Sequence, residues 1–419
     1  MGYYRIRGGH GLNGSLTVQG AKNSVLPILA ATLLVGGTYT IRNCPDISDV
    51  DAALEILEYL GCRVEKNANG VEINTNTVDR SDIPDRLMRK MRSSVIFLGA
   101  LLARRGEAKI SLPGGCELGP RPIDLHMTAL RKLGAHIEER EGYLWCDAED
   151  GLHGQDICLM TPSVGATENA MLCACGCNGT TVIRGAAREP EIEDLGCFLQ
   201  KMGAEISGLG TSQICVRGST ELHGTDYVVL GDRIAAATYL CAVAATGGTL
   251  HISGICPEYA GGVTEALTRA GCDISFGEKE ITLRSGGLLR GIGPVRTAPY
   301  PGFPTDAQAI LMAALAGGTG STMFVENMFE SRYGHVDELR RLGADIQVSD
   351  RVAVVTGAGK LRGARVYGTD LRGTAALVVA ALAAKGTTYV FGLNHIRRGY
   401  QHLPEELQKL GADIQEIQE

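Results

Sequence analysis

Hydrophobic and polar positions follow one pattern that recurs six times along the chain. Each repeat has an apolar run of helical length, a strand-like run, a polar loop, an amphipathic segment and an apolar residue followed by glycine. The apolar residue and its glycine end the amphipathic segment and are called the stop of the repeat. The six stops are Leu60-Gly61, Leu133-Gly134, Met202-Gly203, Ala270-Gly271, Leu342-Gly343 and Leu410-Gly411. Successive glycines are 73, 69, 68, 72 and 68 residues apart. A fixed period of this length indicates one supersecondary unit per repeat, and glycine after the last apolar residue predicts a helix end.

The first helical run of each repeat is apolar on nearly every side. These runs cover residues 24–34, 93–103, 166–174, 233–245, 306–316 and 372–384. A helix without a polar face has to be buried, and a unit of about 70 residues is too small to bury one alone. The second run, as in residues 50–60, has one acidic face and predicts a helix at the surface. We therefore predict an α/β fold in which strands and amphipathic helices surround clustered apolar helices.

Symmetry suggests that three repeats form each domain. The length of 419 residues also suggests more than one domain. We predict a first domain over residues 22–230 that carries a cysteine loop, and a second domain made of residues 1–21 and 231–419.

Composition narrows the class of protein. The chain is 44% apolar and 21% charged, its net charge is −7, and no long basic run occurs, which argues against nucleic acid as a partner. No apolar run approaches the roughly 18 residues of a membrane helix. The N-terminus lacks the apolar core of a signal peptide and predicts a first strand. Thirteen scattered cysteines favour a reducing compartment. We expect a cytoplasmic protein without membrane insertion.

Three cysteines stand close together at Cys173, Cys175 and Cys177. They lie in or just after an apolar helical run, without a histidine nearby. Their spacing matches no zinc pattern, so we interpret them as buried residues near a helix end rather than as metal ligands.

Polar residues recur at two places in the repeat. The starts of the apolar helices hold Lys22, Asn23, Arg92, Ser163, Val164, Gly165, Asp232, Arg233, Asp306, Asp370 and Arg372. The loop after the next strand holds Cys116, Arg121, Arg188, Glu189, Arg332, His395, Arg397 and Arg398. Each residue alone is explained as a helix cap or a solvated charge, and Asp232 and Asp306 are good caps. The arginines and the lysine together favour an anion-binding cleft, because helix N-termini and guanidinium groups bind phosphate and carboxylate.

Cys116 is the cysteine in a polar loop, within a Gly- and Pro-rich segment at residues 112–122. Such a loop can close over a site. Arg121 would lower the pKa of its thiol and Glu117 would raise it. A purely structural cysteine is the alternative.

Several motifs resemble one enzyme family along the whole chain, the UDP-N-acetylglucosamine 1-carboxyvinyltransferases. The motifs are Gly20-Ala-Lys-Asn23, Met91-Arg-Ser-Ser94, Leu112-Pro-Gly-Gly-Cys116, Arg121-Pro-Ile-Asp-Leu-His126, Ser163-Val-Gly-Ala-Thr167, Ala187-Arg-Glu-Pro-Glu-Ile192, Arg296-Thr-Ala-Pro299, Pro301-Gly-Phe-Pro-Thr-Asp306 and Arg398-Gly-Tyr400. The resemblance implies two inside-out α/β barrels, each of three βαβαββ repeats, with the active site in the cleft between them. It implies transfer of the enolpyruvyl group of phosphoenolpyruvate to the 3-hydroxyl of UDP-N-acetylglucosamine, the first committed step of peptidoglycan synthesis. The implied enzyme is a monomer that needs neither a cofactor nor a metal.

The resemblance also implies roles for individual residues. The catalytic residues would be Cys116 as the acid, or as a covalent attachment point, Asp306 as the base for the sugar hydroxyl, Lys22 and Arg398. Phosphoenolpyruvate would be bound by Lys22, Asn23, Arg121, Arg332 and Arg398. The UDP-sugar would be bound by Asn23, Arg92, Arg121, Pro122, Ile123, Asp124, Leu125, Ser163, Val164, Gly165, Asp306 and Met328. Glu189, Asp370 and His395 would complete the charged cleft.

Two positions depart from the pattern of relatives: many of them carry lysine where this chain has Ser48, and some carry lysine where it has Thr161. Two anion contacts are therefore absent. The alternatives are the shikimate-pathway enolpyruvyl transferase, a non-catalytic sugar-nucleotide-binding paralogue and a repeat scaffold for proteins. A cysteine acid in a Pro-Gly-Gly-Cys loop argues against the first. Against the second stands the retention of Lys22, Cys116, Asp306 and Arg398. A single tryptophan and few phenylalanines argue against the third.

Overall fold

The computed structural model describes residues 2–67, 70–91, 93–112 and 123–418, which form two compact units. The first unit comprises residues 20–230 and the second comprises residues 2–19 and 231–418, within those described ranges. Each unit has three central helices surrounded by three four-stranded sheets. The cysteine loop with Cys116, Arg121 and Pro122, and also Arg92, lie outside the described residues.

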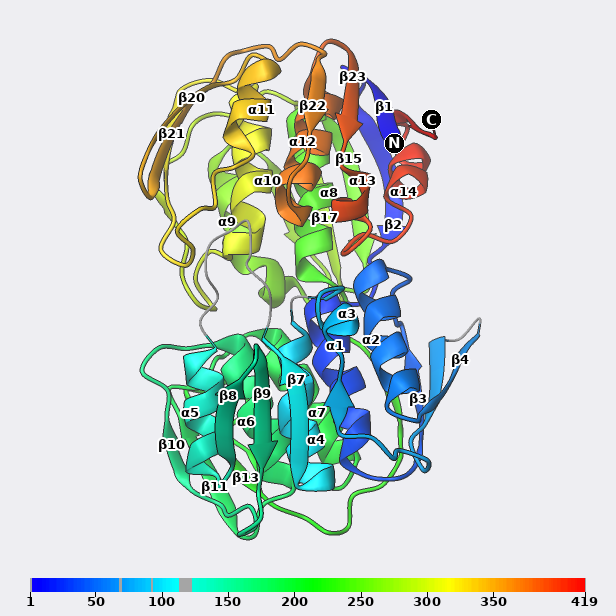
Figure 1. Cartoon of the computed structure of the whole chain (residues 1–419). Coiled ribbons are helices and arrows are strands. Elements are labelled where there is room, and N and C mark those ends of the chain that lie inside the picture. Colours follow the sequence, from blue (N-terminus) through cyan, green and yellow to red (C-terminus); the bar gives the residue numbers. More distant parts are fainter. Residues whose placement is uncertain (1, 68–69, 92, 113–122, 419) are drawn as a thin grey trace. The chain divides into compact units, whose positions relative to one another are not determined.

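The first unit is built from the first three repeats (Figure 1). Its central helices are α1 (Lys22–Ala31), continued by η1 (Thr32–Leu34), α4 (Phe97–Arg105), preceded by η2 (Ser94–Ile96), and α6 (Val164–Cys175). Its other helices are α2 (Ser48–Tyr59), α3 (Asp85–Met88), α5 (Asp124–Lys132) and α7 (Pro190–Lys201).

The sheets of the first unit share one topology, in which an edge strand runs parallel to its neighbour and the other pairs are antiparallel. The first sheet is β14 (Asp226–Val228), β3 (Thr38–Arg42), β5 (Gly70–Asn74) and β4 (Arg63–Asn67). The second is β6 (Asp82–Ile83), β7 (Glu107–Ser111), β9 (Tyr143–Asp147) and β8 (His136–Arg140). The third is β10 (Asp156–Cys158), β11 (Thr180–Arg184), β13 (Gln213–Arg217) and β12 (Glu205–Ser207).

The second unit repeats this plan. Its central helices are α8 (Arg233–Thr246), α10 (Thr305–Ala316) and α12 (Leu371–Ala383). Its other helices are η3 (Pro257–Ala260), α9 (Gly261–Arg269), α11 (Val336–Arg341), α13 (Leu393–Ile396) and α14 (Leu403–Lys409). Its sheets are β22 (Arg365–Tyr367), β23 (Gly386–Phe391), β1 (Tyr3–Gly8) and β24 (Asp413–Ile417), then β16 (Asp273–Phe276), β17 (Glu280–Ser285), β15 (Gly248–Ser253) and β2 (Leu12–Thr17), then β18 (Val295–Arg296), β19 (Ser321–Val325), β21 (Val352–Thr356) and β20 (Asp345–Ser349).

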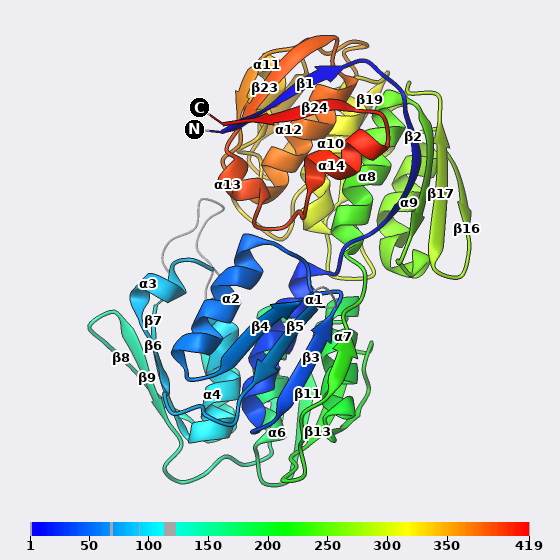
Figure 2. The ribbon, with the colours of Figure 1, turned by 90° about the vertical axis from the view of Figure 1, so that its right-hand side faces the viewer.

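The N-terminal strand completes the sixth repeat rather than the first. β1 lies between β23 and β24 and is antiparallel to both, with Ile6 opposite Thr388 on one side and Ile414 on the other. Figure 2 shows β1 and β24 side by side. The last repeat therefore takes its third main strand from the start of the chain.

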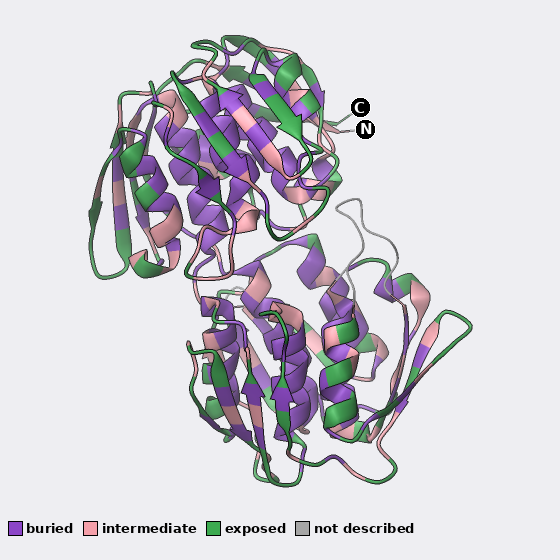
Figure 3. Ribbon diagram, turned by 90° about the vertical axis from the view of Figure 1, so that its left-hand side faces the viewer, coloured by how far each residue is buried: buried purple, intermediate pink, exposed green. Residues whose placement is uncertain are grey.

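Burial explains the apolar sequence of the central helices. In α12 every residue from Arg372 to Leu382 is buried, and α6 and α8 are buried almost as completely. Figure 3 shows buried helices inside each unit and exposed positions on the outer strands. Helices of this kind gain stability only when other elements cover every side. The predicted fold class, two α/β units of three repeats around buried helices, is confirmed.

Glycine ends the outer helix of each repeat, as predicted. All six stop glycines have positive φ angles between 92° and 110°, a conformation that L side chains rarely adopt. They are Gly61, Gly134, Gly203, Gly271, Gly343 and Gly411.

One predicted helix is interrupted near its start. The sequence predicts a continuous helix over residues 93–103, whereas the structure has a 3-10 turn at Ser94–Ile96 before α4. The side-chain amide of Asn169 in α6 takes both partners of the hydrogen bond that would join Val95 and Gly99 in a continuous helix. A side chain that enters the helical ladder in this way breaks its regularity.

Candidate functional site

Lys22, the first residue of α1, lies at the start of a central helix of the first unit. Its ammonium group is 2.5 Å from Oδ2 of Asp49, and the two side chains are only 11% and 2% exposed. A cation at the positive end of a helix is unfavourable, so Asp49 offsets a charge that the helix itself does not favour. Asn23 follows with a half-buried side chain. Ser48, where many relatives carry lysine, is exposed at the start of α2.

The start of α6 brings together the predicted Ser163, Val164 and Gly165. Ser163 caps the helix, since its hydroxyl accepts the N–H of Ala166 at 3.3 Å. All three predicted residues are half-buried. Within the described residues, the N–H groups of Val164 and Gly165 have no hydrogen-bond partner. Helix starts of this kind can bind an anion.

Helix α5 lies against α6 and carries the described part of the predicted nucleotide segment. Ile123 precedes α5, Asp124 is exposed at its start, and Leu125 is half-buried. The next residue, His126, is 8% exposed, and its Nδ1 is 2.8 Å from the amide nitrogen of Asn169. Neither His126 nor Asn169 was selected from the sequence, because their pairing spans 43 residues.

Glu189 precedes α7 and belongs to a group of three glutamates. Burial, together with the charges of Glu191 and Glu189, raises the pKa of Glu168 to about 8. Glu168 lies in the middle of α6, where a carboxylate without a cation is costly, so we expect this group to hold a proton at neutral pH.

In the second unit, Asp306 forms the centre of a charged cluster. One carboxylate oxygen is 2.7 Å from Nη2 of Arg332, and the other is 3.1 Å from Nη2 of Arg372. Both arginine side chains are 4% exposed, whereas that of Asp306 is 29% exposed. The arginines therefore hold the carboxylate from the protein side and leave part of it accessible. The alternative that Asp306 is a helix cap is wrong, because Pro304 occupies the cap position of α10.

The environment of Arg372 fixes its position. Burial lowers the pKa of Arg372, but Asp306 and other negative partners raise it by more, so the net shift is upward. Its Nη1 also donates to the hydroxyl of Tyr400 at 3.3 Å, and that hydroxyl lies 2.7 Å from the hydroxyl of Thr238. Arg372 stood at a recurring position in the sequence, but no role was assigned to it.

Asp370 is the N-cap of α12, and its Oδ1 accepts the N–H groups of Arg372 and Gly373, each at 3.0 Å. It supports the cluster through the backbone of Arg372. His335 lies next to Asp370 and is fully buried; burial lowers its pKa to about 4, against the opposing charge of Asp370. We therefore expect His335 to be neutral beside the two arginines.

The remaining predicted residues of the second unit lie on two other segments. His395 in α13 and Arg398 just after it are half-buried, and Tyr400 connects their segment to Arg372. Met328 is 39% exposed, and its N–H donates to Oε1 of Glu326 at 2.8 Å. Glu326 also accepts the hydroxyl of Thr305 in α10, so it holds the Met328 loop next to the helix that carries Asp306.

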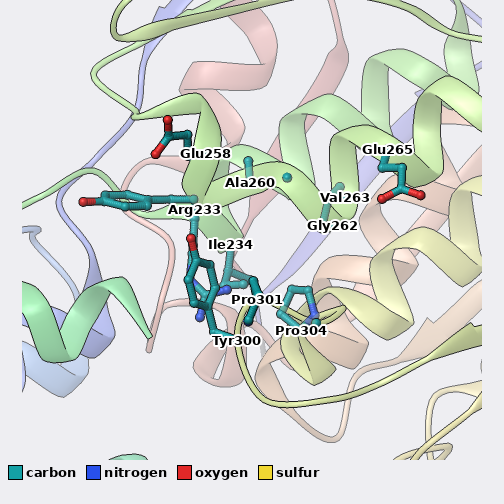
Figure 4. A pocket seen from close by; sticks show the side chains of 13 residues that line it. Arg233, Ile234, Glu258, Ala260, Gly262, Val263, Glu265, Tyr300, Pro301 and Pro304 are labelled. Atoms are coloured by element: carbon teal, nitrogen blue, oxygen red, sulfur yellow. The ribbon is translucent and has the colours of Figure 1, made fainter. Parts of the chain in front are cut away.

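A pocket of about 220 Å³ opens in the second unit next to the start of α8 (Figure 4). Arg233 lies against the ring of Tyr300, with 5.7 Å between guanidinium carbon and ring centroid, and Glu258 and Glu265 also line it. Among the described residues that line this pocket, Arg233 stood at a recurring polar position of the sequence, but none was assigned a role in the reaction. Its two carboxylates make it less suited to a phosphate than the positions described above.

The three clustered cysteines are buried residues near the end of a helix. Cys173, Cys175 and Cys177 are buried in or just after α6, as predicted, and the thiol of Cys177 donates to the carbonyl of Cys173 at 3.4 Å.

Among the described residues, no helix combines the length and the apolar character needed to span a bilayer.

Comparison with known proteins gives the family. The family model of EPSP synthase (3-phosphoshikimate 1-carboxyvinyltransferase) matches residues 6–417. UDP-N-acetylglucosamine 1-carboxyvinyltransferase 2 of Caldanaerobacter subterraneus is 48% identical, and its namesake from Zymomonas mobilis is 47% identical, each over 100% of both chains. The crystal structure of the enolpyruvyl transferase NikO from Streptomyces tendae has a TM-score of 0.89 at 28% identity, over 99% of each chain. The chain therefore belongs to the carboxyvinyltransferase family that the EPSP synthase model describes, and its relatives place it among the UDP-N-acetylglucosamine 1-carboxyvinyltransferases.

Proposed function

We propose that the chain transfers the enolpyruvyl group of phosphoenolpyruvate to the 3-hydroxyl of UDP-N-acetylglucosamine and releases phosphate. This reaction is the first committed step of peptidoglycan synthesis. The observation that carries the proposal is the partly exposed carboxylate of Asp306 between two buried guanidinium groups. The names of full-length relatives supply the two substrates.

Asp306 is the base in this proposal. Arg332 and Arg372 keep the carboxylate ionised and fix its orientation, so its exposed side can accept the proton of the sugar hydroxyl. The Nε–H of Arg332 is buried and has no partner among the described residues. It is therefore a donor available to the carboxylate of phosphoenolpyruvate, next to the group that receives the proton.

The addition step has Cys116 as the acid. Its thiol gives a proton to the methylene carbon of phosphoenolpyruvate, and positive charge develops on the neighbouring carbon. The sugar oxygen bonds to that carbon and loses its proton to Asp306, which gives the tetrahedral intermediate. In the elimination step the bond from carbon to the phosphate oxygen breaks and phosphate leaves with the bonding electrons. The thiolate left on Cys116 by the addition step takes a proton from the methyl group, which restores the double bond.

Cations are needed where phosphate leaves. Lys22, Arg121 and Arg398 have this role in the proposal, because positioned positive charges stabilise developing negative charge in a site without bulk water. The pairing of Lys22 with a buried aspartate supports it, since it holds the ammonium group in place before substrate binds. We further propose that the enzyme is a cytoplasmic monomer that acts on these two small molecules without a cofactor.

The acceptor decides between this proposal and the shikimate-pathway alternative. We expect phosphate release from phosphoenolpyruvate when UDP-N-acetylglucosamine is added and only background release with shikimate 3-phosphate. A coupled phosphate assay with both acceptors measures this. Release with neither acceptor would favour a binding paralogue, and release with shikimate 3-phosphate alone would refute the proposed substrate.

Replacement of Cys116 by serine tests the acid. We expect UDP-N-acetylglucosamine affinity to stay within about threefold, because a serine hydroxyl is nearly the size of a thiol, and turnover to fall by about 10²-fold or more. Calorimetry and the phosphate assay measure the two quantities, and Cys158→Ser, which changes an exposed cysteine, is the control. Full turnover of the Cys116 variant would remove this residue from the mechanism.

A further inference from the structure

The sheet of β22, β23, β1 and β24 carries an apolar row on its outer face. Alternate residues of each strand, such as Tyr4 and Ile6 in β1, belong to the core of the second unit, so the residues between them face outward. The strand register places four outward residues side by side, which we call the apolar row: Tyr367, Phe391, Tyr3 and Ile417. Neighbouring strands are about 4.8 Å apart, so this row is about 14 Å long.

The aromatic rings of the apolar row pack against one another. The rings of Tyr367 and Phe391 are stacked, with 4.8 Å between centroids and 14° between planes, and the ring of Tyr3 lies 5.1 Å from that of Phe391. Tyr367 is 50% exposed, and the other three residues of the row are half-buried. Because two of the rings cover each other's faces, the row suits apolar side chains of a protein better than nucleotide bases, which stack on free ring faces.

The apolar row belongs to this sheet and is not a general feature of the repeat. Among the described residues, every outward row of the other five sheets contains at least one polar side chain. Trp145 on β9, for example, stands in a row with Asp82, Lys109 and Glu138. Nζ of Lys109 lies 3.9 Å from the centroid of the Trp145 ring, so a charge already covers that aromatic side chain.

Three arginines lie beside the apolar row, and we call them the arginine group: Arg5, Arg7 and Arg365. Arg5 and Arg365 stand in the next outward row, and Arg7 stands two residues further along β1. Arg5 donates to the side-chain amide of Gln415 at 2.8 Å, and the guanidinium carbon of Arg365 lies 5.5 Å from the ring centroid of Tyr389. Within the described part of the chain, none of the three pairs with a carboxylate.

The outward rows therefore carry a net positive charge in a chain whose net charge is −7. Asp413, opposite Arg7, is the one carboxylate of these rows among the described residues. Glu338 and Glu416 lie at the border of the sheet, but each is paired with an arginine outside the arginine group. Three arginines and one carboxylate leave the face with an excess of positive charge next to partly exposed apolar side chains.

We infer that this face binds an acidic segment of another protein, whose apolar side chains pack on the apolar row and whose carboxylates pair with the arginine group. Complementary charge directs such a partner to the face, and guanidinium forks suit carboxylates. The two rows are two residues apart along the strands, which is about 7 Å. An extended segment that lies between them directs its alternate side chains to opposite sides, so apolar and acidic residues should alternate in it.

A second copy of this chain does not fit the face. A two-fold contact brings the same patch of both copies together, so it would place one arginine group against the other. An anionic bilayer is also a poor fit, because three of the four residues of the apolar row are half-buried and project little from the sheet. The charge and the burial together favour an acidic protein segment.

A synthetic peptide tests this inference. We expect fluorescein-labelled Leu-Glu-Phe-Asp-Leu-Glu-Phe to bind with a Kd of about 10–100 µM at low salt and more weakly at high salt. Arg365→Glu and Tyr367→Ser should each weaken binding by about five- to tenfold or more. Arg63→Glu and Val228→Ser change exposed residues of β4 and β14 in the first unit, and they should stay within about twofold. Fluorescence anisotropy measures binding, and thermal unfolding shows that each variant is folded.

The competing occupants give different results. The same peptide with lysine in place of its acidic residues should not bind. No binding of the acidic peptide up to about 1 mM, or equal affinity of all four variants, would overturn the inference. So would dimerisation of the unmodified protein that Tyr367→Ser abolishes in sedimentation, or binding to phosphatidylglycerol vesicles that both face variants lose. None of the four substituted residues belongs to the proposed reaction, so phosphate release should be unchanged in every variant.

Discussion

Replacing Asp306 with asparagine is expected to lower kcat for phosphate release by about 10²–10⁴-fold, the range of one general base. Asparagine keeps the shape of the side chain and a hydrogen-bonding oxygen, but it cannot accept the sugar proton. It also leaves the guanidinium groups of Arg332 and Arg372 without their shared counter-ion. Steady-state phosphate release with both substrates at saturation measures the change.

A second aspartate of the same unit is the control for this substitution. Asp345 is exposed on β20, and Asp345→Asn should leave kcat within about twofold, because exposed substitutions of this kind have small effects. UDP-N-acetylglucosamine binding by Asp306→Asn distinguishes lost chemistry from lost binding. An Asp306→Asn enzyme that retains a third of its kcat would show that another group takes the proton.

Replacing Lys22 with methionine is expected to reduce both stability and activity, for separate reasons. The substitution removes the ammonium group that pairs with the buried carboxylate of Asp49, and breaking a buried ion pair from one side costs about 3–5 kcal/mol. It also removes a charge proposed to hold the phosphate, so kcat/KM should fall by about 10²-fold. Urea unfolding and the phosphate assay measure the two effects.

The double variant Lys22→Met with Asp49→Asn separates these effects. It removes both charges, so stability should return toward that of the unmodified enzyme while activity stays low. Lys66→Met is the control, because the Lys66–Asp51 pair is about half exposed and such pairs contribute about 0–1 kcal/mol. Recovery of activity in the double variant would contradict the phosphate role of Lys22.

The apolar runs predicted the architecture because a helix that is buried on every side has apolar residues at nearly all of its positions. The helix expected over residues 233–245 is α8, Arg233–Thr246. A helix that is covered on every side is apolar all round, so an apolar run of helical length is enough to identify it. The same reasoning failed at residues 93–96, where a side chain 74 positions away interrupts the helix.

The candidate site was predictable only where a residue type is rare at its position. A charged residue at the start of an apolar helix is such a signal, and it identified Lys22, Asp306 and Asp370 as candidates. No comparable signal in the sequence shows which residues pair with them. Asp49 looks like any acidic residue in the first turn of a surface helix, and Arg372 reaches Asp306 from 66 residues away. Contacts between residues this far apart in the sequence result from the packing of repeats, and the local sequence pattern does not show them.

The place of β1 between β23 and β24 has a consequence for the order in which the protein forms during synthesis. β1 is made long before β23 and β24, so it has no strand to pair with until residues 386–417 have emerged from the ribosome. The unit formed by residues 20–230 contains all of its own strands and is free to fold while translation continues. β1 is thus among the last strands of its unit to be placed in a sheet.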